Sequence, residues 1–277
     1  MRRWIRAVLL VLGLLFGESL CFGLGSFWQS PSPTPSQAAE LLKAICPSSI
    51  AGDPPSGCRP CPKYTSVGDS WPENVQELFK LDTVLYGSFT AAGAEEALAG
   101  FSGCESHATG FGGTTLLNKV SGAWVMVKYI QAWGTGACRI YHLRTGRDLL
   151  LCAGEYHNMG GGSEYIWLSS ISRDDQSLSG RNVIEVIDTR PACDDHPVWG
   201  TIDKAELHDL NGDGVPDLTV WLSLGQGASL CDVDTSKETV QKLKLDFLFQ
   251  QDTESFVPTL SSKGLIASHR AFFKTDN

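Results

Sequence analysis

The chain has 277 residues, of which 42% are hydrophobic and 19% charged, and its formal net charge at pH 7 is −9. This length and apolar content suit one large or two small globular domains, and they argue against disorder and against a multi-span membrane protein. The negative charge, without clustered Lys and Arg, excludes a nucleic-acid binder, because phosphate neutralisation requires basic side chains.

Residues 1–25 have the order of a secretory signal peptide. Three arginines precede an apolar run over 7–16, and small residues follow. This succession of basic, apolar and small residues predicts export, with cleavage after Ser19 or Gly23. The alternatives are an uncleaved membrane anchor and lipidation at Cys21.

Residues 26–62 are expected to form a Pro/Ser tether followed by a Cys-rich loop. The stretch SPSPTPSQ at 30–37 has the composition of an extended, solvated linker. A short helix is predicted over 37–45. Cys58 and Cys61 form a CxxC pair, but they lie in Pro/Gly-rich coil and no second pair of metal ligands follows. Structural disulfide bonding is therefore favoured over a redox or zinc site.

The cysteines indicate the compartment. The chain has nine, and in an exported protein this number predicts disulfides and a secreted or extracytoplasmic location. In CRIYHLRTGRDLLLC, a turn over 144–146 places glycine where a left-handed backbone is needed. That register sets Cys138 opposite Cys152, within bridging distance, and His142 opposite Asp148. We therefore predict a Cys138–Cys152 disulfide.

Residues 63–277 are expected to form a β-rich domain. A second short helix is predicted over 71–81, and short segments rich in β-formers follow, separated by clusters of Gly, Asn, Asp or Ser. Because no amphipathic helices separate these segments, the predicted fold class is all-β, with antiparallel meander or propeller-like sheets and few short helices. The predicted strands are 83–90, 95–101, 113–120, 123–130, 138–143, 148–154, 164–171, 182–188, 205–210, 217–224 and 242–250.

Two segments share an apolar frame, YGSFTAAGAEEAL at 86–98 and LHDLNGDGVPDLT at 207–219. Their spacing predicts stacked four-stranded units, with the shared physics of hairpins as the alternative explanation. The aligned pairs include Phe89 with Leu210, Gly93 with Gly214 and Glu96 with Asp217.

The second of these segments contains an acidic loop, 209–217. Counting from its first aspartate, side chains with oxygen ligands fall at positions 1, 3, 5 and 9, and Gly214 permits a sharp turn. Hard oxygen ligands in this number suit Ca²⁺ better than Zn²⁺ or Mg²⁺. The alternative is a solvated, Asx-rich turn without a metal. The predicted ligands are Asp209, Asn211, Asp213, Asp217 and the backbone carbonyl of Val215.

The pattern DxNxDGxxD between two strands resembles the FG-GAP/VCBS repeats of integrin-type β-propellers and of many secreted bacterial proteins. The resemblance covers residues 207–221 closely and 86–98 weakly. It implies a blade-like meander in which Ca²⁺ fastens one hairpin. Such repeats serve adhesion, carbohydrate-binding and scaffold proteins alike, so the resemblance does not select one function.

The predicted function is an exported, calcium-binding, non-catalytic module. Its expected partner is a glycan or a protein at the cell surface, and it touches the membrane only through the signal or anchor segment. The sequence has no GxSxG, HExxH or Walker motif. The alternative is a secreted hydrolase acting on polysaccharide or peptide. Its candidate acid–base residues are His107, the His142–Asp148 pair, Asp194 and Asp195, with Trp133, Trp167, Trp199 and Trp221 as sugar-stacking faces.

Overall fold

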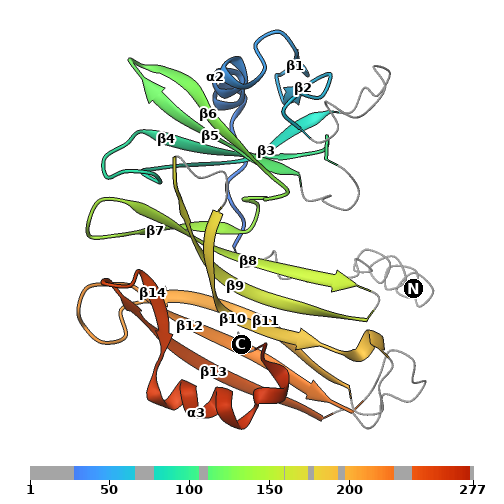
Figure 1. The fold of residues 1–277 in the computed structure, drawn as a ribbon, viewed down its shortest axis with the longest axis vertical. Helices are drawn as coiled ribbons and strands as arrows, with labels where there is room; N and C mark the ends of the chain where they lie inside the picture. The colour runs from blue at the N-terminus through green and yellow to red at the C-terminus, as the bar shows by residue number, and fades with distance from the viewer. Residues whose placement is uncertain are drawn as a thin grey trace, which may run out of the picture.

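The computed structural model describes residues 28–65, 78–105, 112–158, 160–173, 178–192, 197–227 and 239–274. Two β-sheets lie one above the other along the long axis (Figure 1). The helices are α2 (Pro35–Ile45) and α3 (Leu260–Ser268), with 3-10 turns at Arg190–Ala192 and Arg270–Phe272. The strands are β1 (Ile50–Ala51), β2 (Gly57–Cys58), β3 (Phe79–Gly87), β4 (Glu96–Ser102), β5 (Gly113–Val120), β6 (Ala123–Gln131), β7 (Cys138–His142), β8 (Asp148–Asn158), β9 (Gly161–Ile171), β10 (Leu178–Asp188), β11 (Val198–His208), β12 (Asp217–Gln226), β13 (Thr239–Gln250) and β14 (Ser255–Pro258).

Both sheets are antiparallel meanders, which confirms the predicted fold class. The first sheet has six strands in the order β1 to β6, and the second has eight in the order β14 to β7. Within the described residues, the propeller-like alternative and the stacked four-stranded units are wrong. Consecutive strands from β7 to β14 are neighbours in one eight-stranded sheet, although in the described residues β10 and β11 pair only at Asp188 and Trp199, so the strands do not separate into stacked blades.

The alternation of side chains along the strands produces the core. In β13, Leu243, Leu245, Phe247 and Phe249 are buried, and the more exposed Lys244, Asp246 and Leu248 alternate with them, because successive side chains point to opposite faces. This face belongs to the large core of the second sheet. A smaller apolar cluster joins the two sheets, and it contains Leu85, Phe89 and Leu98 from the first sheet with Leu150 and Ile171 from the second.

The predicted helix at 37–45 is confirmed and begins two residues earlier. Thr34 is its N-cap, forms a capping box with Gln37, and is followed by Pro35 at the start of the helix. Leu41 and Leu42 are fully buried against the first sheet. Helix α3 was not predicted. Most of the helix predicted over 71–81 lies outside the described residues, and its last part belongs to β3.

The expected solvated tether differs from the structure at its start. Trp28 is 1% exposed and belongs to the core of the second sheet. The Ser30 N–H donates to Gly136 O at 3.0 Å, and the Val84 N–H donates to Pro31 O at 3.1 Å. Residues 28–31 therefore form a strap that contacts both sheets. The burial of one large indole outweighs the linker-like composition of the residues that follow it.

Three disulfides hold the described part of the chain: Cys46–Cys58, Cys61–Cys104 and Cys138–Cys152. Cys58 and Cys61 bond to different partners, so the CxxC pair is not a redox dithiol. Cys21, Cys193, Cys231 and the signal segment lie outside the described residues. Three disulfides indicate an oxidising, extracytoplasmic environment. None of the helices in the described ranges is long and apolar enough to cross a membrane.

Candidate functional site

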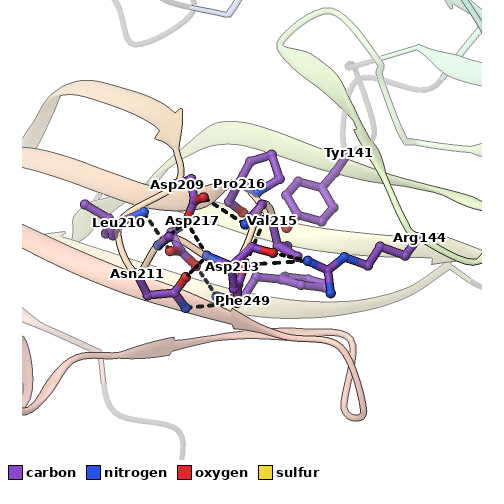
Figure 2. Close-up of polar contacts among 12 residues, drawn as sticks. Tyr141, Arg144, Asp209, Leu210, Asn211, Asp213, Val215, Pro216, Asp217 and Phe249 are labelled. Carbon is purple, nitrogen blue, oxygen red and sulfur yellow. Dashed lines mark hydrogen bonds and ion pairs between the residues drawn. The ribbon is translucent and has the colours of Figure 1, made fainter.

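The acidic loop joins the end of β11 to the start of β12, and it wraps around Asp209 (Figure 2). The Asp209 carboxylate accepts the backbone N–H groups of Gly212 at 2.7 Å and Gly214 at 2.8 Å. It also accepts the N–H of Asp213 at 3.2 Å. These donors, with Gly214 first, lower the pKa of Asp209 below its ordinary value, so the group is held as a carboxylate.

Asn211 and Asp213 lie in the same turn. Asn211 Oδ1 accepts the Asp213 N–H at 2.9 Å, and Asn211 Nδ2 donates to Asp213 Oδ2 at 3.0 Å. Asp213 Oδ1 accepts the Val215 N–H at 2.7 Å. The structure therefore brings the side chains of Asp209, Asn211 and Asp213 together.

Asp217 closes the loop at its base and is fully buried. Its Oδ2 accepts the Leu210 N–H at 3.0 Å, and its Oδ1 accepts the Phe249 N–H at 2.8 Å. Asp217 thus ties the loop to β13. The Val215 side chain is also buried, which fixes the backbone that carries the predicted carbonyl ligand.

The β7–β8 hairpin supplies contacts that the sequence did not predict. Tyr141 OH donates to Pro216 O at 2.6 Å. Arg144 donates through Nη2 to the backbone carbonyl of Asp213, and the same nitrogen lies 3.9 Å from Asp213 Oδ1. Burial, with smaller contributions from Asp217 and Asp213, raises the pKa of Tyr141, so this hydroxyl stays protonated and donates.

The loop over 88–96 keeps the closure of the acidic loop and lacks its oxygen ligands. Glu96, which aligns with Asp217, is 1% exposed; it accepts the Thr90 N–H at 2.8 Å and the Thr90 hydroxyl. Gly93 has a φ of +72°, close to the +78° of its counterpart Gly214. The similarity between segments 86–98 and 207–219 therefore reflects two hairpin loops of similar construction. Each is closed by a buried acid at the start of a strand.

The hydrolase candidates do not form a catalytic arrangement within the described residues. His142 and Asp148 pair in the predicted register, with Nδ1 and Oδ1 2.7 Å apart. The second oxygen of Asp148 accepts the Ser88 N–H, and the His142 side chain is 79% exposed. No hydrogen bond in the described part of the chain joins His142 to a hydroxyl nucleophile. His107, Asp194 and Asp195 lie outside the described residues.

Glu164 is an acid with a perturbed pKa that no sequence pattern indicated. Burial raises its pKa to about 7, and its Oε2 accepts the Ile202 N–H at 2.6 Å. In the described residues, β10 and β11 pair only at Asp188 and Trp199. The Ile202 N–H of β11 therefore has no acceptor on β10, and Glu164 of β9 accepts it. Its role is thus explained by hydrogen bonding at the point where two strands diverge.

The four tryptophans predicted as stacking faces divide into two pairs. Arg190 lies 4.7 Å from the ring centroid of Trp199, and Lys204 lies 5.0 Å from that of Trp221. Trp133 and Trp167 instead line a cleft together.

The acidic loop carries oxygen acceptors of the type that hard cations take. Each Asp213 oxygen accepts one N–H and keeps further acceptor capacity, since a carboxylate offers about four acceptor sites. In the described ranges, no group of three or more His, Cys, Asp or Glu side chains is arranged so that it could hold a metal ion. Comparison of the chain with family models, curated proteins and solved structures gave no match.

Proposed function

We propose that this chain is an exported, non-catalytic binding module whose β11–β12 loop binds Ca²⁺. The observation that carries the proposal is the convergence of Asp209, Asn211 and Asp213 in one turn. A plain Asx turn needs one such side chain, whereas this turn gathers three oxygen-bearing side chains at alternate positions. Two of them are carboxylates that repel each other, and a cation between them would offset that repulsion.

The proposed ligands are the side chains of Asp209, Asn211, Asp213 and Asp217 and the carbonyl of Val215. When bound, Ca²⁺ would neutralise the loop and fix its shape. Asp217 already links the loop to Phe249, and Pro216 is held by Tyr141. A calcium ion here would therefore stabilise β13 and the β7–β8 hairpin as well as the loop.

Export supports this role. The N-terminal sequence has the order of a signal peptide, and extracellular fluids are rich in Ca²⁺ and oxidising enough for the three disulfides. The proposed partner is a glycan or a protein at the cell surface. The likeness to FG-GAP/VCBS calcium loops is proposed for residues 207–221 alone, without the propeller.

The experiment is thermal unfolding of the exported chain in excess chelator, in Ca²⁺ and in Mg²⁺. A ligand that binds only the folded state stabilises it by about 2.7 kcal/mol at a hundredfold excess over Kd. For a domain of this size we expect Tm to rise by about 5–10 °C in Ca²⁺ and by much less in Mg²⁺. Identical melting curves in Ca²⁺ and chelator would overturn the proposal.

A further inference from the structure

A groove opens on the first sheet, beside the first turns of α2. The helix packs on one face of this sheet (Figure 1), and its Leu41 and Leu42 side chains are fully buried there. The groove has a volume of about 530 Å³ and lies between the helix and the ends of β3, β5 and β6. The side chains that line it include Gln37, Glu40, Tyr86, Glu95, Lys119 and Trp124.

The strand register puts three of these side chains on the face that α2 covers. Tyr86 is opposite Ala97, which is opposite Leu117, and both Ala97 and Leu117 belong to the cluster under the helix. Lys119 is two residues from Leu117 and opposite Trp124, so these two share the same face. Tyr86, Lys119 and Trp124 therefore all project toward the groove.

Two aromatic rings meet across the groove. Tyr86 belongs to β3 and Trp124 to β6, with two strands between them, yet their ring centroids are 5.8 Å apart with the planes at 40°. The small side chain of Ala97 leaves room for the rings to lean toward each other. Lys119 Nζ lies 5.4 Å from the Trp124 ring centroid, so the ammonium is held over that ring. Tyr86 is 39% exposed and supplies the open aromatic surface.

The helix cap fixes a hydrogen-bond donor at the same place. Gln37 Oε1 accepts the Thr34 N–H at 2.9 Å within the capping box, which leaves the amide nitrogen of Gln37 free to donate into the groove. Burial raises the pKa of Tyr86, Glu40 adds to the increase, and a hydrogen bond from Gln37 opposes it. Gln37 and Glu40, one turn apart on α2, therefore lie beside the Tyr86 hydroxyl.

The groove carries both signs of charge. The Lys119 ammonium is a donor, and the carboxylates of Glu40 and Glu95 are acceptors. The Lys119 N–H donates to Glu95 O at 2.9 Å, which extends the β4–β5 register and places Glu95 opposite Lys119. An anionic ligand would meet the two carboxylates, and a cationic ligand would meet the ammonium. The charges therefore favour a neutral ligand that can both accept and donate hydrogen bonds.

The floor of the groove favours a sugar over a peptide strand. Ala97 pairs with Tyr86 on one side and with Leu117 on the other, and Leu117 pairs in turn with Met126. Because these strands are paired on both sides, the floor offers no free strand edge to a peptide backbone. Recognition there depends on side chains. A sugar hydroxyl both donates and accepts, and the C–H face of a pyranose ring packs against an aromatic ring.

We propose that this groove binds a neutral pyranose unit of a glycan. The proposal rests on the binding-module function proposed above, and it selects the glycan from the two partners named there. The Tyr86 ring packs against the C–H face of the sugar. Gln37 and Lys119 donate to its hydroxyls, and Glu40 accepts from them.

The test uses neutral and charged hexasaccharides as probes. The neutral ones are chitohexaose, cellohexaose, mannohexaose and maltohexaose; the charged ones are chitosan hexaose and hexagalacturonate. Each is titrated into the exported chain at pH 7, in saturating Ca²⁺ and again in chelator, while tryptophan fluorescence and heats of binding are recorded. We expect saturable binding of at least one neutral hexamer, and binding of the charged hexamers that is at least about tenfold weaker.

Two results would overturn the proposal. One is the absence of binding by all the neutral hexamers, which would leave a protein as the partner. The other is binding of a charged hexamer as tight as that of the neutral ones. Chitosan hexaose differs from chitohexaose only in its acetyl groups and is the matched probe of charge. The groove belongs to the first sheet and the acidic loop to the second, so the sugar titrations and the Ca²⁺ experiment can fail independently.

Variants locate the binding in the groove. Tyr86→Leu removes the open ring and should weaken binding at least about tenfold, whereas Tyr86→Phe keeps the ring and should lose less. Lys119→Met keeps an unbranched stem beside Trp124, removes a donor and should weaken binding several-fold. Tyr156→Leu, which removes a 53% exposed ring from β8, is the matched control and should bind as the parent does. Thermal unfolding of each variant verifies folding, and parental affinity in folded Tyr86→Leu and Lys119→Met would contradict the assignment.

Discussion

Asp217 accepts the backbone N–H of Phe249 at 2.8 Å, across 32 residues of sequence. The other oxygen of the same carboxylate accepts the N–H of Leu210. One buried acid therefore satisfies an amide of the loop and an amide of the neighbouring strand. At the corresponding place in the first sheet, the hydrogen bonds of Glu96 among the described residues go to Thr90. The Asp217 carboxylate thus links its loop to β13, whereas in the described part of the chain the Glu96 carboxylate bonds within its own loop.

Asp217→Ala is expected to destabilise the chain even without calcium. The substitution leaves two amides without their acceptor, and each such buried donor costs about 1–3 kcal/mol. We expect a loss of about 2–4 kcal/mol in the free energy of unfolding, measured by urea denaturation in excess chelator. Asp217→Asn retains one acceptor oxygen and should lose less. Asp252→Asn, in the exposed turn after β13, is the control. If the free energy of unfolding falls only in Ca²⁺, Asp217 acts as a metal ligand and does not stabilise the metal-free loop.

Asp213→Asn is expected to remove the stabilisation by Ca²⁺ while leaving the metal-free chain nearly unchanged. The side chain is 45% exposed, and asparagine can still accept the Val215 N–H. In chelator the variant should unfold within about 0.5 kcal/mol of the parent, as surface substitutions usually do. Melting curves in Ca²⁺ and chelator measure the difference. If Asp213→Asn gains as much in Ca²⁺ as Asp252→Asn does, the loop is not the calcium site.

Glu164 is expected to make stability fall as pH rises. Its pKa is about 7 in the folded chain, against an ordinary value of 4.5. Between these values the folded state keeps a proton that the unfolded state releases. The stabilising contribution is therefore complete below about pH 4.5 and is lost as pH rises through about 7.

Glu164→Gln tests this dependence, because glutamine can accept the Ile202 N–H and does not ionise. The variant should be more stable than the parent at pH 8 and similar to it at pH 4.5, as measured by denaturant midpoints across the range. Glu40→Gln on the exposed face of α2 is the control and should follow the parent. A parent and a Glu164→Gln variant with parallel pH profiles would show that burial does not perturb this acid.

Replacing both Cys138 and Cys152 by alanine is expected to cost about 3 kcal/mol, the chain-entropy value for a loop of about 15 residues. The two cysteines are 14 residues apart and face each other in the β7–β8 register. Urea denaturation of the double variant gives the loss, and mass spectrometry under non-reducing conditions gives the pairing. Finding the six described cysteines free in the exported protein would remove the argument for an oxidising compartment.

The features that the sequence predicted correctly depend on residues that lie close together along the chain. The Cys138–Cys152 hairpin follows from a short turn and strict alternation, both of which can be counted along the chain. The acidic loop was likewise found from spacing, and the structure brings its side chains together. Each predicted strand overlaps an observed one for the same reason.

What the sequence could not predict depends on contacts between distant segments. The propeller was wrong because similarity between two loops does not determine how the strands between them pair. The pKa of Glu164 is raised by burial, beside the point where β10 and β11 diverge, and no local pattern encodes that environment. Arg144 and Tyr141 contact the acidic loop from far along the chain: 69 residues separate Arg144 from Asp213, and 75 separate Tyr141 from Pro216.

The strap formed by residues 28–31 has a consequence for the order in which the chain can fold. Trp28 belongs to the same core cluster as Phe256 and Phe273. Synthesis runs from the N-terminus, so Trp28 is made before every strand that contributes to this cluster. Its indole therefore stays in water until strands of the second sheet, the first of which begins at Cys138, have followed it. The strap is among the first segments to be made, yet the contacts of Ser30 with Thr135 and Cys138 span 105 and 108 residues.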